Sequence, residues 1–546
     1  MSEEPQTPER SGRRAAGVVG VAVVGSRLMG LLRELVFAAM FGAGKSYDAF
    51  LAAFQIPNLM RDLFAEGALS TAFTTTFAKT HEKEGPQPAW ALASLVLSTL
   101  TVVLGTICLL GIVAAPAIVQ VTSFGFHSVP GKFELTVSLT RILFPFILFV
   151  SLAAVVMGIL NARSVFGIPA SASTFFNIVS VVLGVTLAFL FDPQPDWRHP
   201  HFSERALYGV TLAVLAGGLA QLAMQLPELW RQGFHFRWHV DFRDPRLRQV
   251  WRLMWPSVIA GAAVQVNVLV NGVFASEING ARSWLNYAFR LMQFPIGVFG
   301  VAIATVTLPA VARHHAREDL AAFGRTVEES LRLACFLTIP AAVGLFVLAP
   351  QIIGIIYQRG QFAAGDTLRT AAALRAYVVG LAGYAAIKVL TPCFYALDRP
   401  RTPLLVGLFG VGANLVMNLV LVKVLHLGHV GLAASTGVLA LINCLQLTLY
   451  LRQSVRFGSA RDWLRLAFGV GASAAAAGAI AWWVLQLVGH AAGAGFVWRA
   501  ATLAAAIGAA TFTYGGLALL LKVPEATAFW RFGAQLWRRL TRAARA

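Results

Sequence analysis

The chain has 546 residues, of which 57% are hydrophobic and 13% are charged, and its mean hydropathy is +0.68. Soluble domains carry about 25% charged residues, so a chain this apolar is expected to fold largely in lipid. The net charge of +19 does not indicate nucleic-acid binding, because the basic residues lie in short segments between long apolar runs, where they orient a membrane protein. The composition therefore predicts a multi-pass membrane protein that contacts membrane lipids and binds no nucleic acid.

Long apolar runs predict an all-α fold with about fourteen membrane-spanning helices, each of at least roughly 18 residues. Two of the ranges, the second and the eighth, are the least typical because they contain both charged residues and proline. The predicted ranges are 16–42, 46–78, 89–121, 132–161, 168–190, 205–232, 247–276, 283–312, 325–357, 366–397, 401–424, 430–453, 461–488 and 497–522.

Lysine and arginine are concentrated on one side of these predicted helices. If the N-terminal tail 1–15 is cytoplasmic, the inside segments hold about 25 of them and the outside loops hold six. Because positive charge accumulates on the cytoplasmic side, both termini, including the basic tail 523–546, are expected to lie inside at the cell (inner or cytoplasmic) membrane. The six outside residues are Lys45, Lys132, Arg198, Arg282, Arg359 and Lys423.

An internal repeat relates the two halves of the chain at a shift of about 235 residues. Tyr47 precedes Pro57 by ten residues, as Leu285 precedes Pro295, and the two prolines lie in the similar segments FQIPNLMRDLF and FRLMQFPIGVF. The repeat predicts two six-helix lobes around a central cavity, as in transporters built from parallel repeats. The expected organisation is an N-terminal lobe at 16–232, a C-terminal lobe at 247–453 and two additional helices at 461–522.

Several charged residues fall inside the apolar segments, most of them between Ser26 and Phe73. A charge at the bilayer centre costs about 2.5–3.5 kcal/mol, so these residues are expected to face a polar cavity or one another. Two interpretations stay open: the arginines pair with neighbouring carboxylates, or they bind a phosphate-bearing ligand, whose oxygens match the guanidinium fork. The candidate ligand-binding residues are Arg27, Arg33, Arg61 and Arg290, with Glu34, Gln55, Asp62, Glu66, Asn286 and Gln293 as supporting residues of the cavity.

No sequence pattern predicts an enzyme or a resident cofactor. The segment GAGKS at 42–46 resembles the end of a phosphate-binding loop, but Ala39 stands where that motif requires glycine. The four cysteines are far apart in the sequence and have no metal or redox spacing. We therefore expect a transporter without catalytic residues or a metal, driven by the membrane potential, with a counter-ion of unknown identity for the return step.

The run SRLMGLLRE…FGAGKSYDAF…FQIPNLMRDLFAEGALSTAF closely resembles the N-terminal signature of the MurJ (MviN) lipid II flippases. The segments FPFILFVSLAAVVMGILNA, YAFRLMQFPIGVFGVAIATVTLPAV and KVLTPCFYALDRPRTP are similar to other segments of that family, and the resemblance covers roughly residues 15–455. It implies the fold of the multidrug/oligosaccharidyl-lipid/polysaccharide exporter superfamily, in which two lobes alternate between inward-open and outward-open states. The last two helices are then expected to form a groove for a lipid tail.

The resemblance also implies a substrate. It is lipid II, an undecaprenyl-diphosphate-linked disaccharide-pentapeptide, moved from the inner to the outer leaflet for peptidoglycan synthesis and hence for cell wall biogenesis and cell shape. A monomer is expected, with cell-wall synthases as candidate partners. The alternatives are an exporter of another polyprenyl-linked oligosaccharide or of drugs, and a scaffold for cell-wall enzymes that transports nothing. A cation-coupled drug exporter would favour a cavity rich in carboxylates, whereas these segments are rich in arginine.

Individual positions follow from the same resemblance. The four arginines match cavity arginines of the family, and Asp48 and Ser283 match further substrate-binding positions. Gln55 stands where relatives have lysine, and Gln293 where they have glutamate, so a strict pairing of charges at these two positions is not expected. An ion site of some relatives corresponds to Asn271, Asn414 and Asn418, which lack the charge that favours Na⁺.

Overall fold

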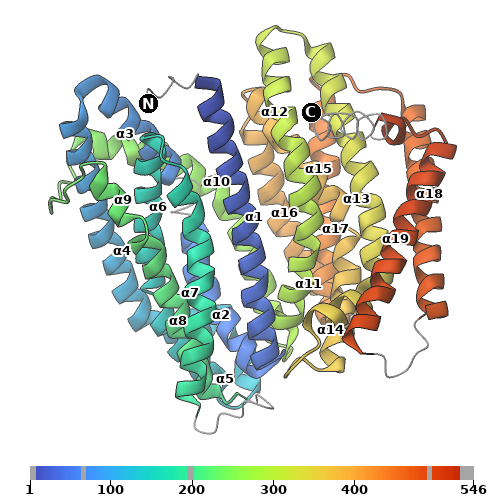
Figure 1. The fold of residues 1–546 in the computed structure, drawn as a ribbon, viewed down its shortest axis with the longest axis horizontal. Helices are drawn as coiled ribbons and strands as arrows, with labels where there is room; N and C mark the ends of the chain where they lie inside the picture. Colours follow the sequence, from blue (N-terminus) through green and yellow to red (C-terminus); the bar gives the residue numbers. More distant parts are fainter. Residues whose placement is uncertain (1–7, 63–68, 193–201, 489–494, 529–546) are drawn as a thin grey trace, which may run out of the picture. The chain divides into compact units, whose positions relative to one another are not determined.

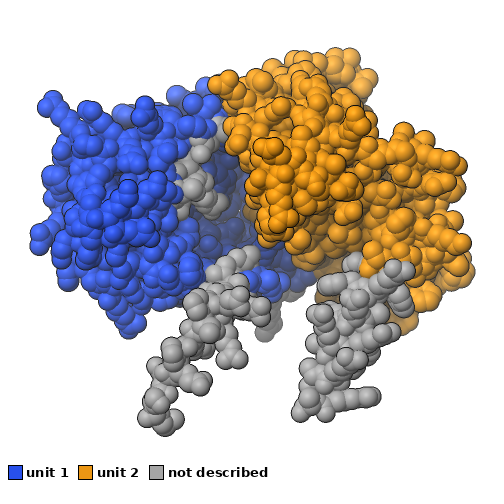
Figure 2. All heavy atoms as spheres, turned by 90° about the horizontal axis from the view of Figure 1, so that it is seen from above, with its two compact units in different colours: residues 1–283, 359–363 blue, residues 284–358, 364–546 orange. Residues whose placement is uncertain are grey.

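A computed structural model describes residues 8–62, 69–192, 202–488 and 495–528 of the chain. Within these ranges the regular structure is entirely helical (Figure 1), so the predicted all-α class is confirmed. The chain divides into two compact units (Figure 2). Unit 1 comprises Met1–Ser283 and Arg359–Ala363, and unit 2 comprises Trp284–Gln358 and Ala364–Ala546.

Unit 1 contains the first ten α-helices. The helix α10 packs on α3 and α4, which explains why it belongs to this unit although the repeat assigns it to the second predicted lobe. The lobe boundaries themselves stay a prediction. The helices are α1 (Pro8–Phe41), α2 (Lys45–Arg61), α3 (Ser70–Glu84), α4 (Pro86–Thr122), the short η2 (Phe124–Ser128), α5 (Lys132–Leu143), α6 (Phe146–Ala162), α7 (Gly167–Phe191), α8 (Glu204–Ala223), α9 (Leu226–Arg231) and α10 (Pro245–Ser276).

Unit 2 contains the remaining helices, including the two that lie outside the repeat. Its first helix, α11, begins three residues before the boundary of unit 1. The helices are α11 (Ala281–Pro295), the π-turn η3 (Ile296–Gly300), α12 (Val301–Ala316), α13 (Leu320–Tyr357), α14 (Ala364–Val378), α15 (Leu381–Ala396), α16 (Arg401–Asn418), the π-turn η4 (Leu419–Val424), α17 (Gly428–Arg452), α18 (Ala460–Val488) and α19 (Phe496–Leu520).

Fewer described helices have the length and apolar composition of a membrane span than the sequence predicts. Among the described residues, ten helical stretches are long and apolar enough to cross a membrane, or eleven if α14 and α15, bent by 47°, form one span. These correspond to eleven of the fourteen predicted ranges. The other three are helical but do not meet the same test, so the count of fourteen is not confirmed. They are 16–42 in α1, 46–78 in α2 and α3 with residues 63–68 outside the description, and 247–276 in α10.

The segment 359–363 joins α13 to α14 of unit 2, yet it packs within unit 1. The backbone N–H of Gln361 donates to the carbonyl of Ala39 at 2.9 Å, near the end of α1. Gly42 and Gly360 both adopt positive φ there, at 61° and 57°, and a Cβ on either residue would collide with the facing backbone. Glycine is therefore required on both sides of this contact.

The two units share a local device that supports the predicted repeat. Pro116 in α4 and Pro350 in α13 lack an N–H, which leaves the carbonyls of Ile112 and Phe346 without their helical partners. In unit 1 the Nε of Arg141 donates to the Ile112 carbonyl at 3.3 Å. In unit 2 the Nε of Arg375 donates to the Phe346 carbonyl at 3.0 Å. Each residue of the second set follows its counterpart by the same number of positions, close to the expected shift of about 235.

Helix α19 is held to the rest of unit 2 through α13. Pro340 leaves the carbonyl of Phe336 without a helical donor, and the hydroxyl of Tyr514 on α19 donates to it at 2.6 Å. Near the start of α13, the Nε of Arg332 donates to Glu525, just after α19, at 2.5 Å. Proline thus frees carbonyls on α13 that residues of neighbouring helices satisfy, which ties these helices to it.

Candidate functional site

A buried network surrounds Asp48 in the first turn of α2. One carboxylate oxygen accepts hydrogen bonds from the Nζ of Lys132 at 2.8 Å and the backbone N–H of Gly280 at 2.7 Å. The other oxygen accepts from the backbone N–H and the hydroxyl of Ser283 at 2.9 and 2.6 Å. The side chains of Asp48 and Lys132 are both 0% exposed. Asp48 therefore serves as a remote cap for the free N–H groups at the start of α11.

The ion pair is tolerated because both partners have further interactions. The Nζ of Lys132 also donates to the side-chain oxygen of Asn279 at 3.0 Å and lies 4.1 Å from the centre of the Phe126 ring. A buried ion pair offsets its desolvation only when the remaining donors and acceptors are satisfied, as they are here. In this structure Asp48 and Ser283 bind each other and exclude solvent, so their predicted contact with a substrate stays a prediction.

Arg282 forms a second buried hub beside this pair. Its Nη1 donates to the Oε1 of Gln55 at 2.8 Å, and its Nη2 lies within 2.7–2.8 Å of the Thr122 carbonyl, the Ser123 hydroxyl and the Gly272 carbonyl. The amide of Gln55 in turn donates to the Val268 carbonyl at 3.2 Å. Glutamine can accept from a guanidinium, whereas the lysine implied for relatives at this position cannot.

Lys132 and Arg282, the two basic residues of this network, are not among the site residues predicted from the sequence, which counts them with the outside loops. The structure shows both side chains buried at the starts of α5 and α11. A signal was present in the sequence: Asp48, inside an apolar segment, requires a basic partner. Hydropathy could not show which basic residue supplies it, because the partners are far apart in the chain.

Three of the four predicted anion-binding arginines lie in unit 1. Arg27 is exposed on α1 and makes no hydrogen bond or ion pair with the part of the chain that the structure describes. Arg33 is half-buried, with its guanidinium carbon 5.2 Å from the centre of the Phe176 ring. Arg61 is part-exposed at the end of α2 and donates to Asp62 through Nε and Nη2 at 3.2 and 2.9 Å.

The carboxylates near these arginines differ in their surroundings. Asp62 accepts from Arg61 and also, through its second oxygen, from the amide of Gln265 on α10 at 3.3 Å. The internal pairing that the sequence left open is therefore confirmed for Arg61 and Asp62. Glu34 is buried on α1. Glu66 lies outside the described residues.

The fourth arginine, Arg290, lies on the exposed face of α11 in unit 2. One face of this helix is buried through Trp284, Tyr287 and Met292. Asn286 is half-buried, and Arg290 and Gln293 are exposed on the opposite face, as the helical spacing predicts. Because Arg290 and the other three arginines belong to different units, their convergence on one ligand stays a prediction.

The three asparagines of the predicted ion site also divide between the units. Asn271 is half-buried on α10, whereas Asn414 and Asn418 are buried one turn apart on α16. The side-chain oxygen of Asn418 accepts from the hydroxyl of Ser435 at 2.5 Å. Over the described ranges no group of three or more His, Cys, Asp or Glu side chains is suited to a metal ion. The ion site stays a prediction.

Comparison with known proteins gives a consistent family match. The family model described as lipid II flippase MurJ matches residues 37–501. A lipid II flippase MurJ from Burkholderia cenocepacia is 34% identical over 463 residues, which cover 84% of this chain and 87% of that protein. A probable lipid II flippase MurJ from Vibrio cholerae is 32% identical over 518 residues, covering 93% of this chain and 95% of that protein.

Solved structures match the fold over most of the chain. A structure described as lipid II flippase MurJ in an inward closed conformation aligns with a TM-score of 0.73 at 22% identity, covering 94% of this chain and 98% of that one. An inward-facing multidrug resistance transporter of the MATE family, in the MOP superfamily, aligns with a TM-score of 0.67 at 14% identity, covering 78% of this chain and 94% of that one. At these identities the structural matches support the fold alone.

Proposed function

Because the chain belongs to the lipid II flippase MurJ family, we propose that it moves lipid II from the inner to the outer leaflet during peptidoglycan synthesis. The family match over residues 37–501 is the observation that carries this proposal. The chain then acts as a transporter without catalysis, in the cell (inner) membrane, as a monomer with both termini in the cytoplasm. Its partners are lipid II and membrane lipids, and cell-wall synthases are the expected protein partners.

The proposed ligand of the arginines is the diphosphate of lipid II. Arg27, Arg33, Arg61 and Arg290 supply guanidinium forks, which bind phosphate oxygens through paired hydrogen bonds. The exposure of Arg27 and Arg290 on their helices supports this role, because a ligand can reach both side chains. Asp62 holds the Nε edge of Arg61 and so fixes the orientation of its fork.

Asp48 acts in this proposal as a positioning residue for Arg290. Its carboxylate pairs with Lys132 and accepts hydrogen bonds from Gly280 and Ser283, which fixes the first turn of α11. Arg290 lies seven residues farther along the same helix, about 10 Å along its axis. Anchoring the start of α11 therefore limits how far Arg290 can shift when the helix bends at Pro295 and the π-turn that follows.

The membrane potential is the proposed energy source. Outward movement of negative charge is favoured by about 2.3 kcal/mol per charge for each 100 mV, inside negative. The bound arginines reduce the net charge that moves, so a counter-ion is proposed for the return step, with Asn271, Asn414 and Asn418 as its candidate ligands. The undecaprenyl chain stays in the lipid phase beside α18 and α19, because a polar route would remove it from its favourable solvent.

The test is rescue of a flippase-depleted bacterium by single alanine variants at Arg27, Arg33, Arg61 and Arg290. The exposed Lys388 on α15 provides a matched control, since it is another cation within an apolar helix. We expect the arginine variants to lose rescue at normal membrane levels while Lys388→Ala retains it. If all four arginine variants rescue, the arginines do not bind the substrate. If cells that carry the unmodified chain grow but never expose lipid II at their outer face, the chain acts as a scaffold or as an exporter of another compound.

A further inference from the structure

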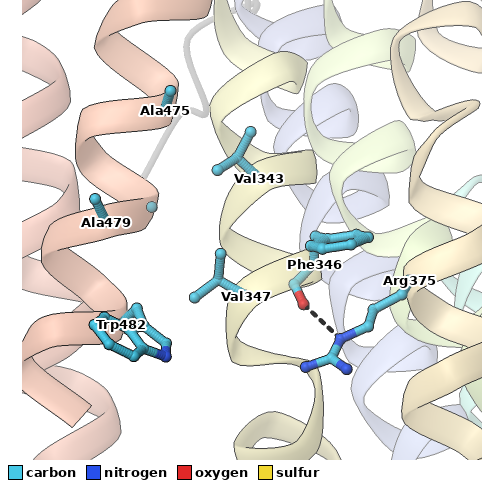
Figure 3. A pocket seen from close by; sticks show the side chains of 8 residues that line it. Val343, Phe346, Val347, Arg375, Ala475, Ala479 and Trp482 are labelled. Atoms are coloured by element: carbon cyan, nitrogen blue, oxygen red, sulfur yellow. Dashed lines mark hydrogen bonds between the residues drawn. The ribbon is translucent and has the colours of Figure 1, made fainter. Parts of the chain in front are cut away.

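A groove of about 330 Å³ lies on unit 2 between α13, α14 and α18 (Figure 3). Val343, Phe346 and Val347 of α13 form one wall, and Ala475, Ala479 and Trp482 of α18 face them. The remaining lining residues are Gly478 and Arg375. A Cβ at Gly478 would lie 2.6 Å from Val343, so glycine lets the two helices approach closely here. The volume lies within the range of small-molecule sites.

Arg375 is the charged residue of this lining. Its Nε is committed to the Phe346 carbonyl at 3.0 Å, and the guanidinium carbon lies 5.7 Å from the centre of the Phe346 ring. The side chain is exposed, and no other hydrogen bond or ion pair holds it within the described ranges. A guanidinium has five N–H donors, so the terminal amino groups retain donors that Nε does not use. In a lipid environment such donors require an acceptor.

Unit 1 contains an equivalent arginine, Arg141. Arg141 donates through Nε to the Ile112 carbonyl that Pro116 frees, as Arg375 does for Phe346. The facing wall of the groove in unit 2 comes from α18, and α18 lies outside the predicted repeat. The carbonyl bond therefore explains why an arginine occurs at both positions, but it does not explain the apolar groove beside Arg375.

We propose that this groove binds a phospholipid of the surrounding bilayer, with its phosphate on the terminal amino groups of Arg375. The acyl chain of that phospholipid lies over the apolar surface of Val343, Val347 and Trp482. The side chain of Trp482 is 56% exposed, so a lipid can reach it. A single guanidinium matches one phosphodiester bidentately. The substrate's diphosphate carries more charge and is assigned above to four other arginines. The site goes beyond the proposed function, and the bound lipid braces α18 against α13 and α14.

Photocrosslinking to the full-length chain tests the site. The chain is placed in phosphatidylcholine nanodiscs that contain a small fraction of phosphatidylglycerol with a photoactivatable acyl chain, and crosslinked peptides are identified by mass spectrometry. We expect crosslinks within residues 343–347 and 475–482. Arg375→Gln should reduce them at least tenfold, because it removes the charge that holds the phosphate, whereas the matched Arg141→Gln should leave them within twofold. Ala479→Phe, which fills the groove from an exposed position, should reduce them with Arg375 intact.

Two results would overturn the proposal. One is equal labelling of the native chain, Arg375→Gln and Ala479→Phe, which would mean that the groove holds no specific lipid. The other is found in a parallel arm with photoactivatable undecaprenyl diphosphate. If Arg375→Gln lowers labelling of residues 343–347 by the undecaprenyl diphosphate probe but not by the phosphatidylglycerol probe, the groove binds the substrate. Flipping of lipid II in cells by Arg375→Gln is measured separately, so loss of the phospholipid site and failure of the proposed function are distinguishable.

Discussion

Two charged regions of the molecule satisfy their charges in opposite ways. In unit 1, Asp48 and Lys132 are fully buried, form an ion pair and hydrogen-bond their neighbours. In unit 2, Arg290 and Arg375 are exposed on their helices, as Arg27 is in unit 1. The two units also share one device, since Arg141 and Arg375 satisfy equivalent carbonyls, and in unit 2 Arg375 also lines a groove. The same arginine–carbonyl hydrogen bond thus occurs in both units, and in unit 2 the additional helix α18 packs beside it and forms a groove.

The largest expected effect on the free energy of unfolding comes from breaking the buried ion pair of unit 1. Lys132→Met leaves Asp48 buried without its cation, and removal of one partner of a buried pair costs about 3–5 kcal/mol. The exposed Lys388→Met in unit 2 should change the free energy of unfolding by no more than about 0.5 kcal/mol. Thermal unfolding of the solubilised chain measures both. Equal unfolding midpoints for the two variants would show that the ion pair of Asp48 and Lys132 does not stabilise the fold more than an exposed lysine does.

A smaller effect is expected at the proline-freed carbonyl that ties α19 to α13. Tyr514→Phe leaves the buried Phe336 carbonyl without a donor, which costs about 1–3 kcal/mol. In a Pro340→Ala background the backbone N–H of residue 340 can donate to that carbonyl, so the same substitution should have little effect. The double-mutant cycle is read from unfolding midpoints. Additive effects of the two substitutions would contradict the shared role of this carbonyl.

The equivalent arginines offer a direct comparison of the units. Arg141→Met and Arg375→Met each remove one hydrogen bond to a freed carbonyl, so each should lower the free energy of unfolding by about 1 kcal/mol in detergent. Restoring the backbone donor with Pro116→Ala or Pro350→Ala should compensate in the respective unit. A loss at Arg375 several times that at Arg141, measured without added lipid, would mean that the two arginines are not structural equivalents.

The smallest effect concerns the start of α10 and depends on pH. The hydrogen bond from Arg246 lowers the pKa of the Asp244 carboxyl, which also caps the helix at the N–H of Arg246. A carboxyl with a lowered pKa in the folded chain stabilises it above the unfolded value of about 3.9, and this is lost as pH falls through the folded pKa. Because both side chains are partly exposed, the contribution is less than about 1 kcal/mol.

Amide exchange in the first turn of α10 is the measurement for this effect. Exchange of residues 246–249 should accelerate as the pH is lowered from neutral to below about 3.9, beyond the change in intrinsic exchange rate. Arg246→Gln should shift that acceleration to higher pH, because it removes the main cause of the lowered pKa. An unchanged profile in Arg246→Gln would contradict this assignment.

The sequence was sufficient for features that depend on local pattern. Apolar runs located the ten or eleven described helical stretches that are long and apolar enough to cross a membrane, and helical spacing put Arg290 and Gln293 on one exposed face. It was insufficient for pairings between distant residues. Lys132 and Arg282 can be buried because Asp48 and Gln55, far away in the chain, accept hydrogen bonds from them. Hydropathy places a basic residue in a loop whenever it lies at the end of an apolar run.

The proline device is visible in the sequence, since Pro116 with Arg141 and Pro350 with Arg375 recur at one shift. The groove is not, because it depends on how closely α18 approaches α13, which no repeat predicts. The predicted arginine site has a similar limit. Its four arginines lie on α1, α2 and α11, but a shared ligand depends on tertiary arrangement and not on local pattern.

The most direct test of the account is the accessibility of lipid II at the outer face of flippase-depleted cells that carry this chain. The account predicts that the unmodified chain restores external lipid II, that Lys388→Ala does so equally, and that Arg27→Ala and Arg290→Ala do not at equal membrane levels. External lipid II that stays absent with the unmodified chain, despite its normal insertion, would contradict the proposed flippase activity.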